Sequence, residues 1–176
     1  MRRVILGILA AGLVLGGGLP SASADTGSKS DPSGDASRQI DITRLTVTNG
    51  DQRVVMRIKV RDLRKRGVFN VHYWGGTTGT PPARSAIVST RLVDGERVVE
   101  YLTCGREDCQ QVRCRGMRLD WRPVADVVVM STPQRCYPRP RNNPDAPAPA
   151  VGRFFASGEF SDDIDSTNGL LTVQRG

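Results

Sequence analysis

Four cysteines are the residues of this 176-residue chain whose spacing most directly suggests chemistry. Cys104, Cys109 and Cys114 follow one another at intervals of five residues, and Cys136 comes 22 residues after the third. Structural zinc sites favour close C-x2-C pairs, whereas four, four and 21 residues separate the neighbouring cysteines here. An even number of cysteines favours two disulfides over thiolate metal ligands if the chain is exported, as its N-terminal residues predict below. No cysteine is then left over to act as a nucleophile.

The strand pattern selects one of the three possible disulfide pairings. If residues 115–121 and 127–131 form a hairpin that turns at 123–126, residues whose numbers add up to about 250 face one another. Cys114 and Cys136 satisfy this relation, and directly opposed strand positions have the separation that a disulfide needs. Cys104 then pairs with Cys109 across a small loop.

His72 is the only histidine, so a histidine-dependent catalytic triad has a single possible starting point. It shares a predicted strand face with Trp74. The chain contains no G-x-S-x-G, P-loop, H-E-x-x-H or dinucleotide-binding motif. A hydrolase would need His72 or paired carboxylates to converge in one pocket, so we expect a noncatalytic protein in which His72 and Trp74 are candidate ligand-binding residues.

Basic residues concentrate between positions 53 and 66, where Arg57, Lys59 and Arg61 alternate on one face of a predicted strand. Such a row can bind a polyanion, or it can be a solvated face that keeps a sheet edge from aggregating. Nucleic acid does not fit an exported protein in which aromatic residues are not interleaved with the charges. An anionic polymer of the cell envelope or a glycan is the expected partner.

Carboxylates gather in two stretches of the chain. They are Asp31, Asp35 and Asp41 in the first, and Glu159, Asp162, Asp163 and Asp165 in the second. The second stretch begins like a calcium loop, but its glycine is one place late and Gln174 stands where an EF-hand needs glutamate. An EF-hand is therefore excluded, and an irregular calcium site and a solvated acidic turn are the alternatives.

The first 24 residues predict a secretory signal peptide. Arg2 and Arg3 precede an apolar run, which is followed by a Gly/Pro break and by Ala22-Ser23-Ala24, with cleavage expected after Ala24. The apolar run is shorter than the roughly 20 residues needed to span a bilayer, and no second apolar span follows. We therefore expect a secreted mature chain, and its oligomeric state stays open.

The elements that position these residues are predicted to be strands. Residues 25–37 are rich in Ser, Gly and Asp without apolar periodicity, which predicts a flexible leader. Residues 38–176 then form one domain with about eight alternating segments. These are residues 40–47, 54–60, 68–74, 86–93, 96–103, 115–121, 126–131 and 151–157. They predict an all-β, jelly-roll-like antiparallel β-sandwich stapled by the two disulfides.

Turns and loops punctuate these segments. Asn49-Gly50 and Asp94-Gly95 predict tight hairpin turns with positive φ. Residues 75–85 and 136–150 are long, proline-containing loops, which are either binding loops or tolerated insertions.

Several motifs carry a resemblance. D-P-S-G-D at 31–35, the segments D-I-T-R-L-T-V and V-V-M-R-I-K-V-R-D-L, and C-R-G-M-R-L-D-W-R-P from Cys114 resemble small exported bacterial proteins of unknown function. The N-terminal third is also distantly similar to sandwich modules of the DOMON and family 9 carbohydrate-binding type. This resemblance implies structural calcium at Asp31, Asp35 and Asp41 and an aromatic platform for sugar, for which Trp74 is a candidate. No other cofactor is expected.

The expected function is that of a secreted, noncatalytic β-sandwich that binds a cell-envelope or extracellular ligand. A carbohydrate-binding module and a secreted hydrolase are the alternatives.

Overall fold

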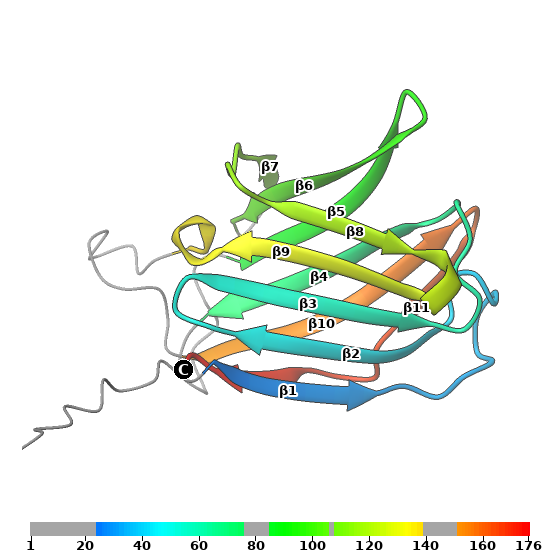
Figure 1. The fold of residues 1–176 in the computed structure, drawn as a ribbon, viewed down its shortest axis with the longest axis horizontal. Helices are drawn as coiled ribbons and strands as arrows, with labels where there is room; N and C mark the ends of the chain where they lie inside the picture. Colours follow the sequence, from blue (N-terminus) through cyan, green and yellow to red (C-terminus); the bar gives the residue numbers. More distant parts are fainter. Residues whose placement is uncertain (1–23, 76–84, 106–107, 139–150) are drawn as a thin grey trace, which may run out of the picture.

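A computed structural model describes residues 24–75, 85–105, 108–138 and 151–176, which form two antiparallel sheets packed face to face (Figure 1). The five-stranded sheet contains, in spatial order, β1 (Asp25–Ser30), β2 (Ile42–Asn49), β3 (Arg53–Val60), β9 (Val127–Pro133) and β8 (Arg118–Arg122). The predicted all-β sandwich is confirmed. The predicted signal peptide, except for Ala24, lies outside the described residues, as do residues 76–84 and 139–150 of the two long loops.

The second sheet has seven strands. Its order is β11 (Asp163–Ser166), β10 (Val151–Phe160), β4 (Val68–Gly75), β5 (Ser85–Val93), β6 (Glu96–Cys104) and β7 (Cys109–Gln111), and β12 (Leu171–Gln174) also pairs with β10. One-turn 3-10 helices at Pro123–Ala125 and Gln134–Cys136 flank β9. No helix among the described residues is long and apolar enough to cross a membrane.

The core lies between the sheets because apolar side chains alternate inward along the strands. The five-stranded sheet contributes Ile42, Leu45, Val47, Val54, Met56, Ile58, Val60, Val128 and Met130, and the seven-stranded sheet contributes Phe69, Val71, Tyr73, Ala86, Val88, Tyr101, Phe154, Ala156, Leu171 and Val173. β2 contains an irregularity, seen as a register shift between Ile42 and Arg44 in its pairing with β3. This shift lets both halves of β2 point apolar residues into the core.

The predicted flexible leader is partly wrong, because its first residues form β1. This strand pairs with β2 from Asp25 opposite Asn49 to Ser30 opposite Arg44. It was not recognised because an edge strand of small polar residues shows no apolar alternation. Gly27 packs inward, and a Cβ at this position would lie 2.8 Å from Cγ2 of Val173.

Both predicted disulfides are confirmed. Cys104 bonds to Cys109, its partner in the pairing of β6 with β7. Cys114 bonds to Cys136 with a Cα–Cα distance of 5.8 Å. The β8–β9 hairpin is present, with a register one residue from the predicted one, since Arg118 faces Ser131. Two disulfides fit an oxidising compartment.

Candidate functional site

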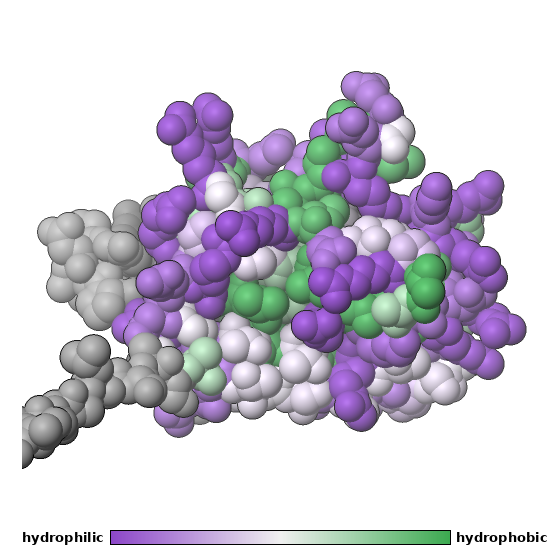
Figure 2. Space-filling view, in the orientation of Figure 1, coloured by the Kyte–Doolittle hydropathy of each residue, from purple (hydrophilic) through white to green (hydrophobic). Residues whose placement is uncertain are grey.

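The outer face of the five-stranded sheet carries many basic residues. Figure 2 shows this face as hydrophilic side chains around hydrophobic patches. Its outward-pointing basic side chains are Arg44, Arg53, Arg57, Lys59, Arg118 and Arg122, while Asp120 is the outward acid on the same strands. Apolar surface lies between the charges, where Val55, Val127 and Val129 are half-buried. This face therefore combines exposed positive charges with partly exposed apolar side chains.

A shallow depression on this face is lined by Thr43, Arg44, Thr46, Arg57, Lys59 and Val127. Lys59 opposes Arg44 across the β2–β3 pair, and Thr46 opposes Arg57. The Lys59 ammonium donates to the Ala125 carbonyl at 2.7 Å and lies 3.6 Å from the Asp126 carboxylate. Among the described residues, no carboxylate lies within ion-pair distance of Arg44 or Arg57. Asp120 interacts electrostatically with Arg57, but its ion pair is with Arg122. Both guanidinium groups therefore lack an ion-pair partner among the described residues and can bind an external anion.

Arg61 does not join this depression. It follows the last residue of β3, and its Nη1 lies 3.4 Å from Oδ2 of Asp41. Of the predicted basic row, Arg57 and Lys59 line the depression, while Arg61 balances a buried carboxylate at the end of the sheet.

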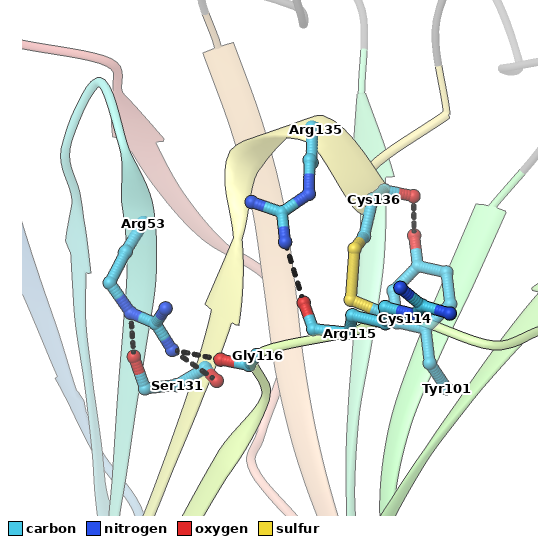
Figure 3. The surroundings of a disulfide bond; sticks show 8 residues. All are labelled: Arg53, Tyr101, Cys114, Arg115, Gly116, Ser131, Arg135 and Cys136. Carbon is cyan, nitrogen blue, oxygen red and sulfur yellow. Dashed lines mark hydrogen bonds between the residues drawn. A yellow bond between two sulfur atoms is a disulfide. The ribbon is translucent and has the colours of Figure 1, made fainter.

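Further arginines lie near the Cys114–Cys136 disulfide (Figure 3). Arg53 donates from Nε to the Ser131 hydroxyl at 2.8 Å and from Nη2 to the Gly116 carbonyl at 2.8 Å. Arg135 donates to the carbonyl oxygen of Arg115 at 2.8 Å. These acceptors are neutral and leave the positive charges uncompensated. Burial, with repulsion from neighbouring arginines, lowers the pKa of Arg53.

His72 and Trp74 lie on the outer face of the other sheet, so the predicted ligand-binding residues do not form one site. The His72 ring stacks on Phe155 with a centroid distance of 4.2 Å and an interplanar angle of 6°, and the corresponding values for Trp74 and Phe155 are 5.1 Å and 18°. Parallel rings at these distances cover part of each other's faces. Trp74 is therefore half-buried in a ring cluster rather than a bare platform.

The aromatic cluster contains one residue that was not predicted from the sequence. Phe155 pairs with His72 across β4 and β10. Strand alternation alone predicts that the side chains of Phe154 and Phe155 point to opposite faces of the sheet. The pairing itself could not be foreseen, because about 80 residues separate the two strands in the chain. Burial lowers the pKa of His72, so its imidazole is neutral at pH 7.

The two acidic stretches meet at one end of the sandwich. The connection between β1 and β2, coloured blue at the right of Figure 1, lies beside β11. Asp31, Asp35 and Asp165 each offer a carboxylate oxygen, and these atoms lie within 4.8 Å of one another. Asp163 secures the arrangement by accepting a 2.7 Å hydrogen bond from the backbone N–H of Ser37.

Backbone donors orient the cluster. Asp31 accepts a hydrogen bond from the N–H of Asn168 at 2.7 Å, and Asp165 accepts from the N–H groups of Ile42 and Ser166. Burial is the main cause that raises the pKa of Asp31 and of Asp165, and repulsion from Asp35 adds to it in both cases. The folded chain thus holds these carboxyl groups where their negative charges oppose one another.

Asp41, predicted with Asp31 and Asp35, is fully buried at the edge of this cluster. Its Oδ2 accepts from the N–H of Gly34 at 2.7 Å and from Arg61. Asp165 of the second stretch takes the third place in the cluster instead.

The chain matches no protein-family model, and it matches no curated protein or solved structure. The resemblance to DOMON and family 9 carbohydrate-binding modules therefore stays a prediction.

Proposed function

We propose that this chain is a secreted, noncatalytic β-sandwich protein that binds an anionic cell-envelope polymer across the outer face of the five-stranded sheet. The observation that carries the proposal is the depression in which Arg44 and Arg57 point outward and form no ion pair with any of the described carboxylates. The predicted signal peptide and the two disulfides support a location outside the cytoplasm.

The chemistry of the face favours phosphate or carboxylate groups on an extended chain. Guanidinium groups present paired donors that match the oxygens of both anions. Neighbouring strands lie roughly 4.8 Å apart, so basic side chains of adjacent strands can contact successive anionic groups of one polymer. The summed positive potential also raises the rate at which a polyanion reaches the surface.

The test uses the mature, disulfide-bonded protein and fluorescein-labelled polyglycerol phosphate and polygalacturonate, with labelled dextran as a neutral polymer. Fluorescence anisotropy should show binding to an anionic polymer that weakens as NaCl is added, because salt screens exposed charges. The double variant Arg44→Gln/Arg57→Gln should lose about tenfold in affinity, equivalent to about 1.4 kcal/mol.

The matched control is Arg64→Gln/Arg91→Gln, which removes the same charge from exposed arginines that pair with Asp62 and Glu100. The control should bind like the unmodified protein. Equal losses in both double variants would mean that only net charge matters, and the proposed face would be rejected.

A second candidate is the binding of a neutral glycan at the aromatic cluster of His72, Trp74 and Phe155. Three nearly parallel rings on one sheet face favour it. In the same assay, dextran binding that is lost in Phe155→Ala and insensitive to NaCl would support this candidate over the basic face.

A further inference from the structure

We infer that Asp31, Asp35 and Asp165 bind a calcium ion, which joins the β1–β2 connection to β11. This inference is independent of the proposed polymer binding, because it concerns a different group of residues at the end of the sandwich.

The spacing of the carboxylates fits a shared ion. Calcium binds oxygen ligands at about 2.4 Å, so two oxygens on one ion can be at most about 4.8 Å apart. The three carboxylate oxygens meet this limit, since all lie within 4.8 Å of one another. They come from segments far apart in the sequence, and hydrogen bonds to the backbone hold both segments in place.

A second observation points to a missing positive partner. Asp31 is only 9% exposed, and its Oδ1 accepts the N–H of Asn168 while its buried Oδ2 has no hydrogen-bond partner. The adjacent Asp41 is completely buried, and its Oδ1 is also without a partner. A buried carboxylate oxygen without a donor is costly, and a cation satisfies such an oxygen directly.

The type of ligand selects the metal. The cluster consists of carboxylates alone, and hard oxygen ligands suit calcium or magnesium rather than zinc or copper. Magnesium needs nearly ideal octahedral geometry, whereas calcium accepts irregular arrangements of carboxylates, carbonyls and water. Ligands drawn from a connection and a separate strand therefore favour calcium.

Asp35 is the best position for a test because it is exposed and its replacement leaves the hydrogen bonds of Asp31 and Asp165 intact. The mature protein is treated with EDTA, dialysed, and titrated with CaCl2 in a calorimeter, and its Tm is measured with and without the ion. We expect binding of one calcium per chain, a rise in Tm, and a weaker response to MgCl2. Asp35→Asn should weaken calcium binding at least about tenfold.

The matched control is Asp162→Asn, which removes an exposed carboxylate from the residues just before β11. It should bind calcium like the unmodified protein. An absence of binding heat together with an unchanged Tm would overturn the inference. Equal weakening in Asp35→Asn and Asp162→Asn, or equal binding in all three proteins, would overturn it too, because either result indicates diffuse surface binding.

Discussion

His72 shows how its surroundings change the meaning of a single residue. As the only histidine it is the natural starting point for a catalytic hypothesis, yet its imidazole stacks on Phe155 and lies near Trp74. Burial lowers its pKa below the ordinary value of 6.5. The ring is therefore held as a neutral aromatic group, which suits packing or the stacking of a ligand.

This neutral state predicts a dependence of stability on pH. Because the folded state disfavours the charged ring, the stability that His72 contributes is present above pH 6.5 and is lost as the pH falls through the lowered folded-state pKa. His72→Phe keeps an aromatic ring without the titration. Urea unfolding at about pH 7.5 and about pH 5.5 should show a smaller loss of stability on acidification in this variant. Equal losses in both proteins would contradict the buried, neutral ring.

Two hairpin turns were predicted from glycine-containing dipeptides, and the structure confirms the geometry of one of them. Asp94 and Gly95 have φ values of 50° and 82°, so the tight turn predicted between β5 and β6 is confirmed. The same reasoning was wrong for the turn at Asn49-Gly50. The hairpin is present, but neither residue has positive φ, and the N–H of Gly50 donates to the Arg53 carbonyl in a longer connection. A dipeptide predicts a reversal of the chain more safely than it predicts the turn geometry.

Long strands with alternating apolar residues were predictable, and strands of six residues or fewer outside these segments were not. The eight predicted segments correspond to β2, β3, β4, β5, β6, β8, β9 and β10. The missed strands β1, β7, β11 and β12 have three to six residues and owe their order to pairing with a neighbour. The candidate calcium site lies between the β1–β2 connection and β11, and neither β1 nor β11 was predicted. The sequence therefore could not show that Asp165 joins Asp31 and Asp35. Each acidic stretch could be identified in the sequence, but their proximity in the folded chain could not be predicted.

The order of β1 can be tested at Gly27. A Cβ there would lie 2.8 Å from Val173 and 3.0 Å from Leu171, so Gly27→Val should force the edge of the core apart. Overpacking of this kind costs about 1–3 kcal/mol of unfolding free energy, measurable by urea denaturation. Ser28→Val, on the outward side of the same strand, is the control and should change stability little. Two equally stable variants would show that β1 is not packed.

At the scale of the whole molecule, charge is segregated. Basic residues cover the outer face of one sheet, and carboxylates converge at one end of the sandwich. The basic face attracts anions. The clustered carboxylates repel one another unless a cation is bound between them. If the inferred calcium binds, the same sandwich presents a positive surface on one sheet and holds a positive ion at one end.

The acidic end predicts a second dependence on pH. Without an ion, the raised pKa values of Asp31 and Asp165 mean that the associated stability is present below the ordinary value of 3.8 and is lost as the pH rises through the folded-state values. Calcium binds the deprotonated carboxylates, so protons compete with it. The rise in Tm caused by CaCl2 should therefore be larger at about pH 7.5 than at about pH 4.5. A rise that is independent of pH would contradict binding by these carboxylates.

The packing of β1 against β12 also constrains the order in which the molecule can assemble. Gly27 of β1 fits against Leu171 and Val173 of β12, so the first described strand finds its packing partner in the last one. These two strands are far apart in the sequence, and contacts between such distant segments form slowly. The edge of the sandwich at β1 therefore cannot be completed before β12 is available, so we expect this edge to become ordered late in folding.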